Sequence, residues 1–340
     1  MQTKDFNYNL PKELIAKNPV SPRDSSKLMV LNRDSQSINN KIFNELPEIL
    51  NDDYVLVLND TKVIAARLYV QIDDSKGELL LLKRYKENVW KTMVKPGKKF
   101  QINKGFKVIG KKEKISAKVL EVFEDGTRKI EFMDVKSLSN WIDDNGYPPF
   151  PPYIKNSDAS FEDYQTIYSK DSGSIAAPTA GLHFTDSVFE NLNKKGIKKT
   201  FVTLHVSRGT FLPVKSDNIE DHKMHKEWYS ISEQTAEFLN QAKSSGKKIL
   251  AVGTTAVRTL ESNFSNGRFH EQCNETDIFI YPGYKFKAID AILTNFHLPE
   301  STLLMLISAF ASKEFIFEAY KEAITKKYRF YSFGDSMLIL

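Results

Sequence analysis

Six short strand-like runs lie close together between residues 66 and 133, and they limit the possible fold more than any other feature of this sequence. Turn-forming residues such as Pro96-Gly97 and Lys104-Gly105 separate them. Short strands at this spacing favour a small closed β-barrel or a sandwich. A short helix near Ser137–Asn145 and a proline-rich connector, Gly146–Tyr153, follow. The predicted strands are Arg67–Ile72, Glu78–Arg84, Val89–Val94, Phe106–Ile109, Ile115–Val122 and Lys129–Met133.

The sequence on either side of these runs alternates helices with strands. Helices are predicted from Pro11 to Lys17, from Thr185 to Lys195, and after Ser232, Thr254 and Ser301. We therefore predict a mixed α/β core of residues 1–65 and 151–340, into which a small all-β barrel of residues 66–150 is inserted. The strands predicted for the core are Tyr54–Leu58, Thr200–Val206, Lys248–Val252, Asp277–Tyr281 and Ala288–Thr294.

Composition excludes several classes of protein. No run of about 18 apolar residues occurs, so no transmembrane helix is predicted. Residues 1–10 lack the apolar stretch of a secretory signal, and the single Cys273 excludes an internal disulfide and a multi-cysteine zinc site. We expect a cytoplasmic protein. The net charge of +5 permits a nucleic-acid partner without requiring one.

Common catalytic and nucleotide-binding motifs are missing from the sequence. There is no G-x-x-x-x-G-K-[ST], no G-x-G-x-x-G, no H-E-x-x-H and no G-x-S-x-G. These absences argue against a P-loop, a Rossmann dinucleotide site, a zincin and an α/β-hydrolase. His222, His225 and Glu227 lie near one another in sequence, but their spacing fits no common catalytic zinc pattern, so we predict no metal site.

Two glycine- and threonine-containing segments are candidate binding sites. The turn Thr179-Ala180-Gly181, before His183, would present backbone N–H groups and a hydroxyl to a carboxylate or a ribose. The alternative is a tight turn with His183 packed in the core. The segment Gly253-Thr254-Thr255 follows a strand and begins a helix, which is where α/β folds bind ligands, although helix capping alone would also explain the threonines.

Other polar and aromatic residues follow predicted strands or lie in turns. Each of these residues could instead have a purely structural role, in a plain turn, as a core histidine or as a solvated charge. The candidates are Asn59 and Asp60 after the first core strand, Arg258 one helical turn beyond Thr254, Tyr281 and Tyr284 in a Tyr-Pro-Gly-Tyr turn, and Asn295 and His297 before the last helical stretch.

Many segments in one order resemble the S-adenosylmethionine:tRNA ribosyltransferase-isomerase family along nearly the whole chain. One loop departs from the family's usual His-Val-Gly-Leu-Gly-Thr-Phe, because Ser207 and Arg208 stand after His205-Val206. Ser207 restricts the backbone where the family has glycine, which puts the role of that loop in doubt. The matching segments are Phe6–Leu14, Pro22–Asp24, Leu56–Val63, Ala66–Leu68, Tyr164–Tyr168, Ala176–Thr185, His222–His225, Glu227, Val252–Thr255, Arg258–Ser262, Thr276-Asp277, Tyr281–Tyr284, Thr294–Pro299, Ser301–Met305, Tyr328–Phe330 and Gly334-Asp335.

The resemblance implies an enzyme that moves and isomerises the ribosyl unit of S-adenosylmethionine. The acceptor would be 7-aminomethyl-7-deazaguanine at the wobble position of tRNA, and the products epoxyqueuosine-tRNA, adenine and methionine. The fold it implies is an α/β core with a β-barrel insert. S-adenosylmethionine would be a substrate, with no further cofactor and no metal, and we expect a monomer.

The chemistry of that reaction calls for acid–base groups with a pKa near neutral, which histidine supplies best. We therefore assign His183 and His297 as acid–base candidates, with Asp60 or Asp277 orienting a histidine or holding the acceptor amine. The substrate-binding candidates are Asn59, Arg67, Thr179, Ala180, Gly181, His205, Gly253, Thr254, Thr255, Arg258, Tyr281, Tyr284 and Asn295.

Two other functions remain open on the sequence. One is an RNA-binding protein whose barrel is not catalytic, and the other is a transferase or hydrolase that acts on free nucleosides. The segment Lys95–Lys118 is rich in lysine, with Glu113 as its one acidic residue. It is either a solvated surface or an edge that contacts RNA phosphates.

Overall fold

The computed structural model describes residues 1–154, 157–206, 214 and 216–340, and the chain forms two compact units. The larger contains Met1–Lys62, Pro151–Asp171 and Ala177–Leu340, and the smaller contains Val63–Phe150 and Ser172–Ala176. The last segment lies in the predicted core by sequence, but it groups with the smaller unit because the Ile64 amide donates to the Ser174 carbonyl at 2.9 Å. The predicted class, a mixed α/β protein with an inserted β-barrel, is confirmed.

The smaller unit is a closed six-stranded barrel in the order β10-β7-β6-β5-β8-β9. All six predicted strands are present. Strand β5 shows why they form, since Leu68, Val70 and Ile72 alternate with more exposed residues and point into the barrel core. Helix α2 (Leu138–Asn145), capped by Ser137, adds Leu138 and Ile142 to that core. The strands are β5 (Arg67–Ile72), β6 (Ser75–Lys86), β7 (Val89–Lys95), β8 (Gly105–Ile109), β9 (Lys114–Val122) and β10 (Arg128–Met133).

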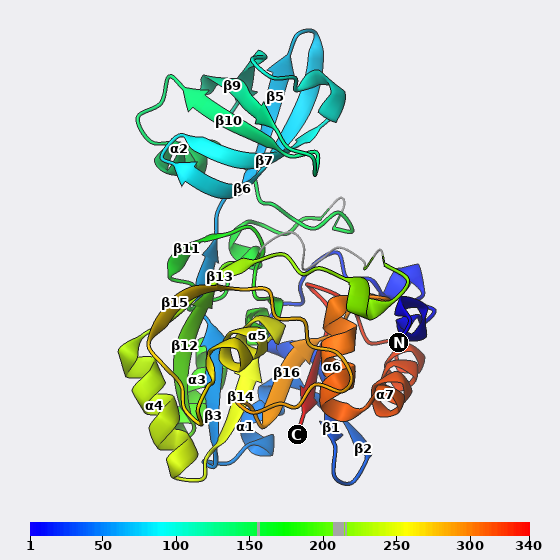
Figure 1. Cartoon of the computed structure of the whole chain (residues 1–340). Coiled ribbons are helices and arrows are strands. Elements are labelled where there is room, and N and C mark those ends of the chain that lie inside the picture. The colour runs from blue at the N-terminus through cyan, green and yellow to red at the C-terminus, as the bar shows by residue number, and fades with distance from the viewer. Residues whose placement is uncertain (155–156, 207–213, 215) are drawn as a thin grey trace. The chain divides into compact units, whose positions relative to one another are not determined.

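The larger unit is built on a nine-stranded sheet in the order β15-β13-β12-β3-β14-β16-β17-β1-β2 (Figure 1). Strands β12, β3, β14 and β16 run parallel, so their carboxyl ends meet at one edge of the sheet. Near-continuous apolar runs form β3 and β14, as expected for strands buried on both faces. The strands are β1 (Lys27–Asn32), β2 (Ser37–Ile42), β3 (Tyr54–Asn59), β12 (Lys198–Leu204), β13 (Glu227–Ile231), β14 (Lys248–Val252), β15 (Gln272–Thr276), β16 (Ala291–Asn295) and β17 (Ser336–Ile339). Strands β4 (Thr61–Val63) and β11 (Asp171–Ser174) form a separate two-stranded sheet.

Helices cover both faces of the large sheet (Figure 1). Helices α1 and α3 pack on one face, where Leu46, Val188 and Leu192 join the leucines of β3 and β14 in one core. Helices α4 and α5 pack on the other. Within the described ranges, none of the helices has both the length and the hydrophobicity that a membrane crossing needs. The helices are α1 (Leu46–Ile49), α3 (Asp186–Lys194), α4 (Glu233–Ser244), α5 (Thr254–Asn263), α6 (Thr302–Ala311) and α7 (Lys313–Thr325).

Three predicted elements of the core differ in the structure. The helix predicted at Pro11–Lys17 is a single 3₁₀ turn, Lys12–Leu14, because the chain then pairs with Phe330. Asp277–Tyr281 is not a strand, since the ladder between β13 and β15 ends where Thr276 lies opposite Glu227. The long helix predicted after Ser301 is divided into α6 and α7 at Ser312, whose φ is 68°.

The side chain of Asn59 extends the pairing of β3 with β12 beyond the end of β3. Its Nδ2 donates to the Leu204 carbonyl at 3.0 Å, and its Oδ1 accepts from the amides of Leu204 at 3.0 Å and Thr61 at 3.2 Å. Asn59 is fully buried. The amide therefore acts as an added peptide group that fixes the carboxyl ends of the two strands.

Replacing Asn59 with alanine is expected to lower the free energy of unfolding by about 2–4 kcal/mol, because several buried backbone groups lose their partner. Urea denaturation would measure the change. The matched control is Asn39→Ala on β2, where the asparagine is exposed, and a change within about 0.5 kcal/mol is expected. Equal effects of the two substitutions would contradict the bridging role of Asn59.

Candidate active site

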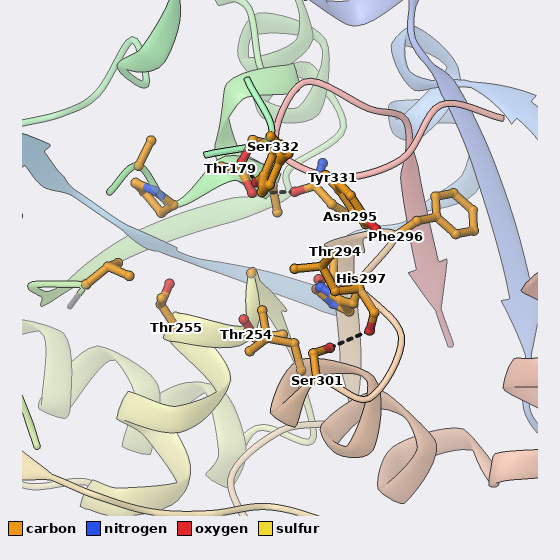
Figure 2. Close-up of a pocket in the computed structure, with 18 residues that line it drawn as sticks. Thr179, Thr254, Thr255, Thr294, Asn295, Phe296, His297, Ser301, Tyr331 and Ser332 are labelled. Atoms are coloured by element: carbon orange, nitrogen blue, oxygen red, sulfur yellow. Dashed lines mark hydrogen bonds between the residues drawn. The ribbon is translucent and has the colours of Figure 1, made fainter. Parts of the chain in front are cut away.

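A cleft that is open to solvent lies at the carboxyl ends of β14 and β16 (Figure 2). The 3₁₀ helix η7 (Thr179–His183), the start of α5 and the start of α6 form its other walls. Parallel strands direct the loops that follow them to one edge of a sheet, which is where α/β folds bind ligands. The lining residues are Tyr153, Ala177, Pro178, Thr179, Ala180, Val206, Gly253, Thr254, Thr255, Thr294, Asn295, Phe296, His297, Leu298, Ser301, Leu303, Tyr331 and Ser332.

Close packing behind η7 fixes this wall of the cleft. A Cβ on Gly181 would lie 1.9 Å from the Tyr168 hydroxyl and 2.9 Å from a methyl carbon of Thr166, so only glycine fits. Thr179, two residues earlier, lies on the cleft side and donates its hydroxyl to Asn295 Oδ1 at 2.8 Å (Figure 2). The turn predicted from the sequence is therefore present and joined to the end of β16.

His183 lies behind Asn295 and does not line the cleft. Asn295 Nδ2 lies 3.1 Å from His183 Nε2, and Ser26 Oγ lies 2.8 Å from its Nδ1. Because Asn295 Oδ1 accepts from Thr179, its Nδ2 faces the histidine as a donor, which places the imidazole proton on Nδ1. Burial lowers the pKa of His183 to about 3, with smaller contributions from Arg329 and Arg23. His183 is thus a neutral group that orients Asn295.

His297 lines the cleft directly. Its Nε2 lies 3.0 Å from Thr294 Oγ1, and its side chain is 8% exposed. Burial lowers its pKa to about 3 as well. Of the two predicted histidines, this is the one that can touch a ligand in the cleft, and it does so as a neutral imidazole.

The start of α5 forms the opposite wall. Gly253 has a φ of 87°, which glycine adopts without strain, and the buried Thr254 and Thr255 follow it. The Thr255 hydroxyl has no hydrogen-bond partner within the described chain. Arg258, one turn further on, points away into a buried ion pair with Glu227 of β13. It does not share the mouth of the cleft as the sequence suggested.

A second polar cluster lies at the carboxyl ends of β3 and β12, the neighbours of β14. The Thr203 hydroxyl lies 2.7 Å from Asp60 Oδ1 and 3.3 Å from Asp171 Oδ2. A hydroxyl has one hydrogen to donate, so it cannot satisfy both carboxylates fully. Burial, and to a smaller extent the charge of Asp171, raise the pKa of Asp60, while the hydrogen bond from Thr203 opposes the rise. Neither carboxylate forms an ion pair within the described residues.

His205 and Trp228 border this second cluster. His205 Nδ1 lies 2.8 Å from Thr61 Oγ1, and its ring stacks on Trp228 with 4.8 Å between centroids. Burial lowers the pKa of His205. Trp228 is 36% exposed, which leaves part of a flat aromatic surface beside the carboxylates. The next residue after His205 is Val206, which lines the cleft, so the two groups of residues are continuous along the chain.

Comparison with known proteins decides the family. A family model described as "Queuosine biosynthesis protein" matches residues 3–339. The chain belongs to this family. The S-adenosylmethionine:tRNA ribosyltransferase-isomerases of Thermotoga petrophila and Clostridium kluyveri are 49% and 48% identical to it, over 341 and 342 residues that span both chains in full. A crystal structure of S-adenosylmethionine tRNA ribosyltransferase from Thermotoga maritima aligns with a TM-score of 0.58 and 40% identity, over 99% of this chain and 100% of that one.

In this queuosine biosynthesis family member, the predicted site residues fall into four groups. Seven of them line the cleft, namely Thr179, Ala180, Gly253, Thr254, Thr255, Asn295 and His297. Gly181 and His183 support its wall, and Asn59, Asp60 and His205 belong to the neighbouring strand ends. The structure does not bring Arg258, Asp277, Tyr281 and Tyr284 into the cleft, and Arg67 belongs to the smaller unit.

Each residue outside the cleft has another environment. Arg67 belongs to the smaller unit, where it contacts Glu78 at 3.4 Å and the Phe150 carbonyl at 2.8 Å. Asp277 is exposed, Tyr281 packs on Phe279, and the Tyr284 hydroxyl donates to Glu261 at 2.9 Å. Ser207 and Arg208, the departure from the family pattern, lie outside the described residues.

Sequence reasoning missed Asp171, Thr203, Tyr153 and Tyr331. Thr203 could have been found, because its spacing of two from His205 in a strand puts both side chains on one face. Asp171 and the two tyrosines lie in segments without a periodic pattern. Tertiary structure alone brings them to the site.

His183 is expected to make the protein less stable in mild acid. Its folded-state pKa is lowered below the unfolded-state value of 6.5. The contribution of His183 to the free energy of unfolding is therefore complete above pH 6.5 and is lost as the pH falls toward 3. Urea denaturation between pH 7 and pH 5 should show that His183→Gln makes the fall in stability shallower, by up to about 1.4 kcal/mol per pH unit. An unchanged slope would mean that the pKa of His183 is the same in the folded and the unfolded protein.

Proposed function

We propose that this protein transfers and isomerises the ribosyl unit of S-adenosylmethionine onto 7-aminomethyl-7-deazaguanine at the tRNA wobble position. The products would be epoxyqueuosine-tRNA, adenine and methionine. The observation that carries the proposal is the match to relatives of that name over the full length of the chain, at about half identity. The cleft and the neighbouring carboxylates supply the groups that this chemistry needs.

S-adenosylmethionine is proposed to occupy the cleft. The rings of Tyr153 and Tyr331 lie 4.9 Å apart at one side of it, and Phe296 contributes a further aromatic side chain. Such side chains suit a flat base such as adenine. The Thr179 hydroxyl, which donates to Asn295, can still accept a hydrogen bond from the ribose, and His297 is placed to bond the substrate as a neutral imidazole.

The acceptor amine is proposed to bind at Asp60. An aminomethyl group is an ammonium ion in water, and it must lose a proton before its nitrogen can attack. Asp60 can hold the ammonium by charge and then take one proton, giving a neutral amine and a neutral carboxyl group. The raised pKa of Asp60 favours that transfer. The exposed face of Trp228 would lie beside the base that carries the amine.

Two predicted acid–base residues have other roles in this proposal. His183 positions Asn295 and Thr179 from behind the cleft, and it does not touch the substrate. Asp277, which is exposed and outside the cleft, takes no part. The steps proposed here are proton transfers and substitutions, so S-adenosylmethionine is a substrate and no redox cofactor or metal is required by the chemistry.

The decisive assay incubates the protein with S-adenosylmethionine and tRNA that carries the aminomethyl base, and measures adenine and methionine. Equal amounts of both products, dependent on the modified tRNA, are expected. A protein that only binds RNA would leave S-adenosylmethionine intact. An enzyme of free nucleosides would release adenine without the modified tRNA.

In the same assay, Asp60→Asn is expected to lower turnover by roughly 10²–10⁴, because it removes the proton acceptor. Binding of S-adenosylmethionine without tRNA should be unchanged. The matched control, Asp53→Asn, changes an exposed aspartate before β3 and should not affect turnover. Full activity of Asp60→Asn would mean that the acceptor amine does not bind at Asp60.

The lysine-rich segment of the barrel does not form one edge. Lys98 and Lys99 lie in the 3₁₀ turn Gly97–Lys99 before β8, whereas Lys111 and Lys112 lie in the connection after it, at its other end. All four are exposed. Lys112 pairs with Asp144 at 2.8 Å, which reduces the positive charge at that end. The barrel therefore offers two separate basic ends to tRNA phosphates.

Reversing Lys98, Lys99, Lys111 and Lys112 to glutamate is expected to weaken tRNA binding and flatten its salt dependence. Each lost phosphate contact should reduce the logarithmic slope by about 0.7–0.9. The two double variants, measured by fluorescence anisotropy, would locate the end that contacts RNA. Unchanged tRNA affinity in the fourfold variant would exclude both ends.

A further inference from the structure

Helix α5 begins at the cleft with an uncapped N-terminus. The amides of Thr254, Thr255 and Ala256 donate no hydrogen bond within the described chain. Its N-cap is Gly253, which has no side chain to accept from them. In α2, α3, α4, α6 and α7, by contrast, a serine or threonine hydroxyl accepts from the first turn. The start of α5 therefore presents unpaired donors and the positive end of a helix dipole.

The Thr255 side chain gives independent evidence of a missing partner. Thr255 is 6% exposed and lines the cleft, and its Oγ1 is buried without a hydrogen bond. Figure 2 shows its hydroxyl directed away from the helix, into the space that the lining residues surround. A buried hydroxyl without a partner is unfavourable, and an acceptor oxygen on a ligand would relieve it.

The walls of the cleft indicate which acceptor fits. Among the described residues that line the cleft, none is Lys, Arg, Asp or Glu. A phosphate group is generally held by basic side chains, which this described lining does not include. A carboxylate carries a single charge, and its two oxygens can accept from amides and a hydroxyl together. Val206, Leu298 and Leu303 add apolar surface suited to methylene groups.

We propose that the α-carboxylate of S-adenosylmethionine binds at the N-terminus of α5, where it accepts hydrogen bonds from the amides of Thr254 and Thr255 and from Thr255 Oγ1. This inference rests on the proposed function, which makes S-adenosylmethionine a substrate. Methionine, the product, keeps the same carboxylate. It therefore competes for the same place, and its alcohol analogue methioninol does not.

The test compares S-adenosylmethionine with its decarboxylated analogue, using calorimetric binding in the absence of tRNA. Wild-type protein is expected to bind S-adenosylmethionine tenfold or more tightly than the analogue, about the effect of one or two charge-assisted hydrogen bonds. Thr255→Val keeps the shape of the side chain and removes the hydroxyl. This substitution should weaken the binding of S-adenosylmethionine by about tenfold and leave the affinity for the analogue unchanged.

Thr302→Val is the matched control. Thr302 is also a buried threonine at the start of a helix, and its hydroxyl also lacks a partner, but it does not line the cleft. It should leave both affinities unchanged. Wild-type protein that releases adenine but binds both ligands equally would overturn this inference and leave the proposed function standing. An equal loss of affinity for both ligands in Thr255→Val would also overturn the inference. If the protein neither binds nor consumes S-adenosylmethionine, the proposed function itself is wrong.

Discussion

The parallel pairing of β3 with both β12 and β14 brings Asp60, Thr203 and the start of α5 to one edge of the sheet. Their register sets Val252 beside Leu58, and Val202 beside Asn59, so that the chain leaves all three strands at the same level. The Asn59 amide then continues the ladder to Leu204. A shift of one residue in the pairing of β3 with β12 would turn Asp60 and Thr203 to opposite faces.

Two charge arrangements within the larger unit differ in how their charges are satisfied. Arg258 and Glu227 neutralise each other, and together they join α5 to β13. Asp60 and Asp171 both lie near the Thr203 hydroxyl, but Asp60 is buried whereas Asp171 is exposed. A buried carboxylate is costly unless it is paired or protonated, so Asp60 is suited to receiving a cation or a proton from outside. The sequence made both Arg258 and Asp60 candidate site residues. The ion pair with Glu227 gives Arg258 a structural role, and Asp60 has no such pair within the described residues.

Local patterns predicted the barrel and four strands of the larger sheet, β3, β12, β14 and β16. The barrel strands follow from alternation and turns, and α3, α4 and α6 from the caps Thr185, Ser232 and Ser301. Strands β1, β2, β13, β15 and β17 of the larger unit were not predicted. Pairing with distant segments defines β15 and β17, and local patterns do not reveal such pairing. The site follows the same rule. The Thr179 and Thr254 segments were visible as motifs, whereas the contact of Asp171 with Thr203 depends on chain folding over 32 positions.

The described walls of the cleft carry no charged side chain, and this affects the order in which the two substrates bind. Hydrogen bonds and apolar contacts would hold the nucleoside substrate there, and neither depends strongly on ionic strength. Contacts with RNA phosphates release counterions and do depend on it. At high ionic strength the protein would hold its small substrate alone, and at low ionic strength either substrate could load first. The order in which the two substrates bind then depends on the ionic strength of the solution as well as on the protein.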